Sequence, residues 1–440
     1  MAISVFGLGK LGATMLSCYA HKKWHVIGVD VNEENVRKIN EGCSPIEEAY
    51  VQQYLHENKE YIEATTDVAY AVNNTDISFI IVPTPSEEDG SFSISCVKKV
   101  IEDIGAILKF KSKYHLVVVT STVLPGDMAY LQSILENISE KKCSSETFGL
   151  CYNPEFIALG RIVHDSLNPD MILIGQSDES AGLALEIFQR AFVENIPEYH
   201  RMNFHNAELT KVGINSYLTM KINFANNIGE ICEKMISGDA GKVLNAIGAD
   251  SRIGNKYFKA GLPAMGPCLP RDCRALINSA WHYEVDFPLA SASEYYNEYQ
   301  KNRIIQNILD IMGARDNDIT ISILGLSYKE NTPVIEESLA IKIAETYARK
   351  NNKIKIYDPM ALDNAMYALR RYSQVIRSDS VQNCLEGSQL CIIATPWSEF
   401  KHLYPKDFID SMECPVVYDM WGILPFNNGE GVVVHRIGQS

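Results

Sequence analysis

Ile3-Ser4-Val5-Phe6-Gly7-Leu8-Gly9-Lys10-Leu11-Gly12 is a short apolar run followed by three glycines in the spacing G-x-G-x-x-G. A strand that runs into such a glycine turn and then into a helix is typical of a dinucleotide-binding βαβ unit. The glycines let a pyrophosphate approach the backbone at the helix N-terminus, where free N–H groups point at it. The stretch therefore predicts a first strand, a phosphate-binding turn and a helix over Leu11–His21.

The next predicted strand, His25–Asp30, ends in an acidic residue. At this place after a glycine turn, a carboxylate accepts hydrogen bonds from the ribose 2′-hydroxyl of the cofactor and would repel a 2′-phosphate. These features predict NAD rather than NADP, and a glycine turn without a ligand is the alternative. The candidate cofactor-binding residues of this segment are Gly7, Leu8, Gly9, Leu11, Gly12 and Asp30.

Strand-length apolar runs alternate with helical patterns through the N-terminal third of the chain. The predicted strands are Ile3–Phe6, His25–Asp30, Ile77–Val82, His115–Thr120 and Phe148–Tyr152, and the predicted helices are Leu11–His21, Glu33–Asn40, Val97–Phe110 and Asp127–Ile138. Such alternation is typical of βαβ units, in which helices cover both faces of a parallel sheet. We therefore expect an α/β domain over residues 1–200 that binds NAD.

The last third of the chain repeats the pattern of the first. Three segments echo N-terminal ones in the same order: Ile321–Leu326 echoes Ile3–Leu8, Lys355–Asp358 echoes Ile27–Asp30, and Ser388–Pro396 echoes Asp76–Pro85. Only Gly325 of the glycine set is kept, so we expect this second domain, residues 306–440, to bind something other than a dinucleotide. The sequence thus predicts an α/β fold with two Rossmann-like, doubly wound parallel-sheet domains, with chance similarity between strands as the alternative.

The middle of the chain predicts a long helix. No proline occurs from Asn206 to Glu233, and apolar residues recur there at helical spacing. We expect this helix and further helices within residues 201–305 to connect the two domains and to carry the loop Gly254–Pro270. The apolar positions of the helix exceed one narrow stripe, which favours contact with a second copy in a homodimer, and burial within one subunit is the alternative.

Composition and charge exclude several classes of function. The chain has 40 Lys+Arg against 55 Asp+Glu and a net charge of −15, so it lacks the positive field that recruits nucleic acids or anionic membranes. Its apolar runs have the length of strands, far below the roughly 18 residues of a membrane span. The 11 cysteines are scattered without a C-x-x-C pair, so we expect reduced thiols in the cytoplasm and no metal site.

Four short segments follow the glycine turn, in the order Ser121-Thr122-Val123-Leu124-Pro125-Gly126, Asn153-Pro154-Glu155-Phe156, Lys211-x-x-x-Asn215 and Gly266-Pro267-Cys268-Leu269-Pro270-Arg271-Asp272. In this order the set resembles the UDP-glucose/GDP-mannose dehydrogenase family, whose members oxidise the primary alcohol of a nucleotide sugar to a carboxylate with two NAD per turnover. The resemblance spans nearly the whole chain. The stretch Arg252–Lys259 resembles the UDP-glucose branch, which favours UDP-glucose as substrate, with GDP-mannose and a UDP-N-acetylhexosamine as alternatives.

The residues of these segments suit such chemistry. Oxidation of an alcohol to an acid takes two hydride transfers, and a thiolate can hold the intermediate aldehyde as a thiohemiacetal that becomes a thioester and is hydrolysed. We expect Cys268 to be this nucleophile, and Asp272 to orient water or act as a base. Lys211 and Asn215 lie four residues apart on the long helix, so they share one face and can both reach an oxyanion.

The resemblance implies further site residues. Thr122 would orient water, and Glu155 would position a lysine or water and take part in acid–base steps. Thr84 and Thr122 would also contact the cofactor, and Arg252 would reach across a dimer interface. The residues implied in substrate binding are Glu155, Lys211, Asn215, Arg252, Tyr257, Lys259, Gly266 and Lys329.

Several positions depart from the family pattern. Leu159, Met265 and Glu336 stand where a glutamate, a glycine and an arginine are usual, and an arginine often found near the C-terminus is missing from Asp419-Met420-Trp421-Gly422. These changes leave the core chemistry intact and leave the exact sugar and the nucleotide base open. Two other functions stay possible in principle: a binding protein that has lost catalysis, and a simple two-electron alcohol dehydrogenase of the 3-hydroxyacid type.

Overall fold

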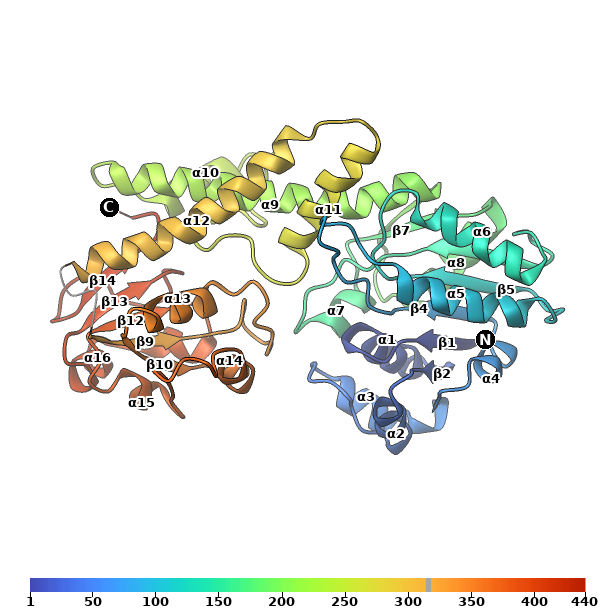
Figure 1. Cartoon of the computed structure of the whole chain (residues 1–440), viewed down its shortest axis with the longest axis horizontal. Coiled ribbons are helices and arrows are strands. Elements are labelled where there is room, and N and C mark those ends of the chain that lie inside the picture. The colour runs from blue at the N-terminus through green and yellow to red at the C-terminus, as the bar shows by residue number, and fades with distance from the viewer. Residues whose placement is uncertain (314–317, 440) are drawn as a thin grey trace. The chain divides into compact units, whose positions relative to one another are not determined.

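The computed structural model describes residues 1–313 and 318–439. The chain divides into two compact units, each with its own sheet (Figure 1). The first, here called the N-terminal unit, comprises Met1–Ile214 together with Asn278–Val285. The second, the C-terminal unit, comprises Asn215–Ile277 and the chain from Asp286 onward.

The N-terminal unit is built on a sheet that, in the described part of the chain, has eight strands in the order β3-β2-β1-β4-β5-β6-β7-β8. The strands are β1 (Ala2–Phe6), β2 (His25–Val29), β3 (Ile62–Thr65), β4 (Ile77–Ile80), β5 (His115–Val119), β6 (Phe148–Tyr152), β7 (Met171–Gln176) and β8 (Glu198–Met202). Neighbouring strands pair in parallel, except that β6 and β7 pair antiparallel. The predicted parallel α/β domain is confirmed, with one antiparallel step near its edge.

Helices cover both faces of this sheet. They are α1 (Lys10–His21), α2 (Glu33–Glu41), α3 (Val51–Glu57), α4 (Val68–Asn73), α5 (Ser95–Leu108), α6 (Asp127–Ser139), α7 (Ile162–Leu167) and α8 (Glu179–Phe192). Successive residues of β5 point to opposite faces: Val118 packs in a cluster with Tyr19 of α1, and Val119 in a second cluster with Leu131 of α6. The continuous apolar run of β5 is therefore buried on both sides, as expected for a central parallel strand.

The C-terminal unit repeats this plan. Within the described residues its sheet has six strands in the order β11-β10-β9-β12-β13-β14, all paired in parallel. The strands are β9 (Thr320–Leu324), β10 (Lys353–Tyr357), β11 (Val375–Arg377), β12 (Leu390–Ile393), β13 (Val416–Asp419) and β14 (Val433–Arg436), and its helices include α13 (Leu339–Ala348), α14 (Leu362–Ala368), α15 (Val381–Leu385) and α16 (Pro405–Ser411). β9, β10 and β12 occupy the places of β1, β2 and β4, so the internal echo predicted from the sequence reflects a repeated Rossmann-like topology.

Four helices link the two sheets along the chain: α9 (Phe204–Lys234), α10 (Ala240–Gly248), α11 (Leu269–His282) and α12 (Pro288–Met312). The 31-residue α9, green in Figure 1, confirms the long helix predicted over residues 206–233. Its first residues belong to the N-terminal unit and the rest, from Asn215, to the C-terminal unit. Among the described residues, no helix combines the length and the apolar character that crossing a membrane requires.

Candidate active site

The glycine turn lies between β1 and α1 and is closely packed at two of its three glycines. A Cβ at Gly7 would lie 2.3 Å from the backbone oxygen of Ile81, and one at Gly12 would lie 1.8 Å from the oxygen of Gly7. Neither position can carry a side chain, because the backbone segments touch there. A Cβ at Gly9 would meet nothing within 4 Å. The backbone before α1 is thus open at Gly9, where a pyrophosphate can approach the helix N-terminus.

Asp30 ties this turn to the end of β2. Its Oδ2 accepts a hydrogen bond from the Leu8 backbone N–H at 2.6 Å, and its Oδ1 accepts one from the Asn32 N–H at 2.8 Å. Oδ2 also accepts a hydrogen bond from Asn35 Nδ2 at 3.5 Å, whereas Oδ1 keeps a lone pair that can accept a ribose hydroxyl. The negative charge opposes a 2′-phosphate, and these residues therefore fit NAD.

The C-terminal unit has the matching turn, but its strand-end carboxylate, Asp358, accepts more hydrogen bonds from the protein. Asp358 Oδ2 accepts the Leu326 N–H at 2.7 Å, as Asp30 does for Leu8. The same oxygen also accepts the Ser327 N–H at 3.1 Å and Trp397 Nε1–H at 3.1 Å, and Asp358 is only 2% exposed. This carboxylate is occupied by protein donors, which explains why a second dinucleotide site is not expected here.

Thr84 and Thr122 follow β4 and β5 at the carboxyl ends of these strands, where open α/β sheets bind their ligands. The Thr84 hydroxyl donates a hydrogen bond to the backbone oxygen of Thr122 at 3.0 Å. The Ser121 hydroxyl accepts the Val82 N–H at 2.9 Å and donates to the Val82 oxygen at 2.7 Å. The two loops are thereby locked to each other, and the structure brings the two predicted threonines together.

Glu208 of α9 holds the other end of the Thr122 loop, and the sequence analysis missed it. Its carboxylate accepts the backbone N–H groups of Gly126 at 2.9 Å and Met128 at 2.7 Å, at the start of α6. Glu208 is fully buried, and burial raises its pKa to about 7, although the two amide donors oppose the shift. Glu208 lies one turn before Lys211 on the same helix, but its partners are backbone N–H groups, which leave no mark on the sequence.

Glu155 and Lys211 also come together. Lys211 Nζ donates a hydrogen bond to the backbone oxygen of Glu155 at 2.6 Å and lies 4.5 Å from the centre of the Phe156 ring. Burial raises the pKa of the Glu155 carboxyl to about 7, and the Lys211 ammonium opposes that shift. A carboxyl that titrates near neutrality beside a buried ammonium can exchange a proton during catalysis.

In the C-terminal unit, Cys268 immediately precedes α11, where the helix N-terminus favours a thiolate. The Cys268 side chain is exposed, whereas Cys273, Cys384 and Cys391 are buried. One turn further along α11, Asp272 Oδ2 accepts a hydrogen bond from Asn215 Nδ2 at 2.6 Å. Asp272 is 3% exposed, so its carboxylate is held in a fixed orientation by Asn215.

The remaining predicted substrate residues also lie in the C-terminal unit. A Cβ at Gly266, which has a φ of +82°, would lie 2.5 Å from the Tyr328 ring, so the loop before Cys268 packs directly against the residue that precedes Lys329. Lys259 Nζ donates to the Trp421 oxygen at 2.8 Å. Arg252 is an exposed side chain whose guanidinium pairs with Asp250 at 2.7 Å, and Tyr257 is 53% exposed. Gly266 and Lys329 therefore lie on neighbouring segments, whereas Arg252 and Tyr257 lie on the surface of this unit.

Comparison with known families decides the identity of this fold. Three models of one family match in sequence: its NAD binding domain over residues 1–193, its central domain over residues 205–299 and its UDP binding domain over residues 322–425. The chain belongs to the UDP-glucose/GDP-mannose dehydrogenase family. The resemblance inferred from the motifs, the two-domain Rossmann-like fold and the NAD cofactor are confirmed, and the enzyme is an NAD-dependent nucleotide-sugar 6-dehydrogenase.

Relatives within the family cover almost all of the chain. The UDP-glucose 6-dehydrogenase TuaD of Bacillus subtilis is 31% identical over 99% of this chain and 93% of its own. A GDP-mannose 6-dehydrogenase of Pseudomonas syringae pv. tomato is 34% identical over 81% of each chain. The solved structure of a UDP-glucose dehydrogenase from Pyrobaculum islandicum is similar with a TM-score of 0.84 and 29% identity, covering 94% of this chain and 96% of that one.

Proposed function

We propose that this dehydrogenase oxidises the C6 alcohol of UDP-glucose to the carboxylate, in two steps that reduce two NAD per sugar. The observation that carries the chemistry is an exposed thiol, Cys268, one helical turn from the paired Asn215 and Asp272 side chains. Support for UDP-glucose comes from two relatives named UDP-glucose 6-dehydrogenase. The one from Bacillus subtilis is 31% identical over 99% of this chain, and the one from Haloferax volcanii is 32% identical over 95% of it.

In the first step the alcohol loses a hydride and a proton and becomes an aldehyde. The glycine turn and Asp30 would hold NAD, which would supply the hydride acceptor. The Lys211 ammonium stabilises negative charge on the reacting oxygen, because a buried cation acts strongly in a low-dielectric site. Glu155, whose pKa is raised to about 7 by burial, takes part in moving the proton away, and Thr122 orients water.

In the second step the Cys268 thiolate adds to the aldehyde carbon, and the carbonyl oxygen becomes the hydroxyl of a thiohemiacetal. Loss of a second hydride and a proton gives a thioester. Water then attacks this thioester, the C–S bond breaks, and the products are the carboxylate and the thiol. Asp272, oriented by Asn215, accepts the proton of the attacking water.

The nucleotide part of the substrate is assigned to the C-terminal unit. Gly266 and Lys329 lie on segments that touch through Tyr328, and Lys259 lies against the Trp421 carbonyl. We assign Lys329 to the diphosphate, Tyr257 to the nucleotide and sugar, and Arg252, which is exposed, to a contact across the dimer interface. In terms of the chain, residues 1–200 bind NAD, residues 201–305 connect and dimerise, and residues 306–440 bind the nucleotide.

The homodimer is assigned to α9. Tyr217, Phe224 and Ile231 recur every seven residues on this helix and are 62%, 53% and 52% exposed. Exposed large apolar side chains in one line on a helix are typical of a helix–helix interface. Light scattering of the purified protein tests this assignment. We expect the mass of a dimer, and a Phe224→Glu variant should shift the equilibrium toward the monomer.

The number of NADH formed per sugar tests the activity. Two NADH and a uronate support the proposal, one NADH and an aldehyde indicate a simple alcohol dehydrogenase, and no NADH indicates a binding protein. UDP-glucose, GDP-mannose and UDP-N-acetylmannosamine are compared in parallel, because each of these substrates appears in the name of a relative or of a similar solved structure. Turnover of GDP-mannose alone would overturn the choice of UDP-glucose while leaving the chemistry in place.

A further inference from the structure

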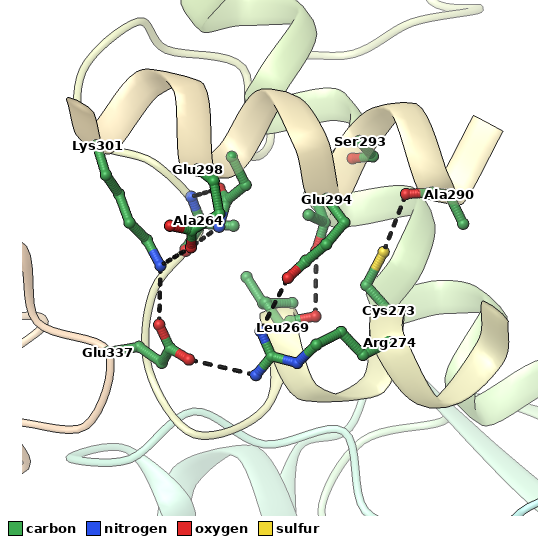
Figure 2. A network of polar contacts seen from close by, with 12 residues as sticks. Ala264, Leu269, Cys273, Arg274, Ala290, Ser293, Glu294, Glu298, Lys301 and Glu337 are labelled. Carbon is green, nitrogen blue, oxygen red and sulfur yellow. Dashed lines mark hydrogen bonds and ion pairs between the residues drawn. The ribbon is translucent and has the colours of Figure 1, made fainter. Parts of the chain in front are cut away.

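The beginning of α11 is held from two sides by other helices of the C-terminal unit. On the α9 side, Asn215 bonds to Asp272, and the Thr219 hydroxyl donates to the Leu269 oxygen at 3.3 Å. On the α12 side, Arg274 Nη1 pairs with Glu294 at 2.9 Å. A dashed line marks this ion pair in Figure 2. Because α11 starts directly after Cys268, whatever holds these first turns also places the thiol.

The segment between β9 and α13 holds α11 from a third side. Glu337 Oε1 accepts a hydrogen bond from Arg274 Nη2 at 3.2 Å, and its Oε2 accepts one from Lys301 Nζ of α12 at 2.9 Å. In Figure 2 this carboxylate lies between the two cations. Both cations lower the pKa of Glu337 despite the burial, so it is ionised at neutral pH. One side chain from the β9–α13 segment thus bonds to both α11 and α12.

Glu337 is not needed to neutralise the charges of Arg274 and Lys301. Arg274 keeps Glu294 as a partner, and Lys301 keeps Glu298 at 2.6 Å, so each cation has a second carboxylate within its own pair of helices. What Glu337 adds is a connection between these helices and the segment that precedes α13. The φ of Glu337 is +55°, an unusual value for a non-glycine residue that indicates a backbone fixed by its surroundings.

Two further contacts join the same segments on the other side of Cys268. The Leu339 backbone N–H donates to the Met265 sulfur at 3.4 Å, and the Tyr328 ring covers Gly266. The loop before Cys268 and the helix after it therefore both rest on residues 328–339. The same segment contains Lys329, which the proposed function assigns to the substrate diphosphate.

We propose that Glu337 is a positioning residue that couples occupation of the nucleotide site to the placement of Cys268. Resting on the proposed function, this inference adds that residues 328–339 move slightly when a nucleoside diphosphate binds, and that the Glu337 carboxylate carries the shift to Arg274 and so to the first turns of α11. The thiol then reaches its reactive position only when the nucleotide is present.

The reactivity of Cys268 toward iodoacetamide tests the coupling without any turnover. The rate is followed by mass spectrometry of the Cys268 peptide, with and without UDP and, in parallel, GDP, since neither carries a sugar that would cover the thiol. Cys43 and Cys96, both exposed, serve as internal reference thiols. In the wild-type enzyme we expect the nucleotide to change the Cys268 rate by about threefold or more, and the reference rates to stay constant.

Glu337→Gln should abolish this response while the nucleotide still binds by calorimetry. Glu298→Gln is the matched control, because it removes the ion pairs of Glu298 with Lys301 and Lys342 but leaves the Arg274–Glu337–Lys301 contacts intact. In turnover, Glu337→Gln should lower kcat on the order of tenfold with little change in the KM for NAD, as expected for a misplaced nucleophile.

The inference is overturned if Glu337→Gln responds to nucleotide like the wild type, if Glu298→Gln loses the response equally, or if neither nucleotide alters Cys268 in the wild-type enzyme. Failure of the proposed function is recognised separately. If the wild type forms no NADH with any nucleotide sugar but its Cys268 still responds to nucleotide through Glu337, then the proposed reaction is wrong. The coupling between the nucleotide site and Cys268 is supported in that case.

Discussion

Lys211 and Glu155 share a hydrogen bond of 2.6 Å from the ammonium of one to the backbone oxygen of the other, so α9 is joined to the segment that follows β6. The Lys211 charge also opposes the rise in the pKa of the Glu155 carboxyl that burial causes. The lysine therefore affects both the geometry and the protonation of this part of the site.

Lys211→Met keeps the apolar stem and removes the charge. We expect kcat for NADH formation to fall by about 100-fold or more, as for loss of one donor to a reacting oxyanion. Without the ammonium the pKa of Glu155 rises further above 7, so the rising limb of kcat/KM against pH should move to higher pH. Lys142→Met, at a side chain 81% exposed, is the control and should change neither quantity. An unmoved pH profile in Lys211→Met would contradict the assigned role.

Glu208 should make stability depend on pH in a defined direction. Its pKa is raised from 4.5 to about 7 in the folded protein, so the folded state binds the proton more tightly than the unfolded chain. The contribution of Glu208 to the free energy of unfolding is therefore largest below pH 4.5 and falls as pH rises to 7, by at most about 3 kcal/mol.

Glu208→Gln removes this titration. The difference in unfolding free energy between the wild type and Glu208→Gln, measured by urea denaturation at pH values across that range, should shift against the wild type as pH rises. A difference that shifts in favour of the wild type would mean that the Gly126 and Met128 amides outweigh burial. Glu208 holds the end of the Thr122 loop through the Gly126 and Met128 amides, so Glu208→Gln should also lower kcat.

Asp30→Asn should relax the choice of cofactor. The amide oxygen can still accept the Leu8 N–H, but the negative charge that opposes a 2′-phosphate is gone. We expect kcat/KM for NAD to fall about tenfold and the preference over NADP to shrink by a larger factor. Asp358→Asn, at the matching place in the C-terminal unit, should leave the ratio between the two cofactors unchanged. The assignment of Asp30 fails if its variant keeps the wild-type ratio.

Cys268→Ser separates the two half-reactions. A hydroxyl is a far weaker nucleophile than a thiolate and a poor leaving group, so uronate formation should stop while some NADH from the first step still appears. Cys43→Ser, at another exposed thiol, should behave as the wild type. Full uronate production by Cys268→Ser would mean that this cysteine only packs in its loop.

Asp272→Asn should slow a later step of the reaction than Cys268→Ser does. The amide can still pair with Asn215, but it cannot accept a proton from water, so hydrolysis of the thioester slows. Intact-mass spectrometry during turnover should then detect the sugar nucleotide attached through Cys268. If no adduct accumulates while uronate release slows, hydrolysis does not depend on Asp272.

Most central strands could be predicted from the sequence because burial on both faces gives continuous apolar runs, as in β5, although β7, which is also apolar and buried, was not among the predicted strands. The edge strands could not. β3 reads Ile62-Glu63-Ala64-Thr65 and β8 reads Glu198-Tyr199-His200-Arg201-Met202, and such mixed sequences arise where only one face or one edge is covered. The short helices α3 and α4 were missed for a similar reason, because each has only two buried residues.

Candidate site residues could be predicted where short motifs carry them, as for Cys268 and the glycine turn. Glu208 could not be predicted, because its partners are backbone N–H groups about 80 residues away, and backbone donors leave no mark on the sequence. Glu337 has the same difficulty: its partners Arg274 and Lys301 lie 63 and 36 residues away. Long-range contacts of this kind become visible only in the folded chain.

The hydrogen bonds that the Asp358 carboxylate accepts from the protein can be compared with those of Asp30 in the other half of the chain. Two halves of one chain use the same strand order and the same bond from a turn amide to a strand-end carboxylate, yet in the C-terminal half the Ser327 amide and the Trp397 indole also donate to that carboxylate. The two turns therefore differ in how many protein donors the carboxylate oxygen already holds, and a single indole N–H contributes to that difference within a shared scaffold.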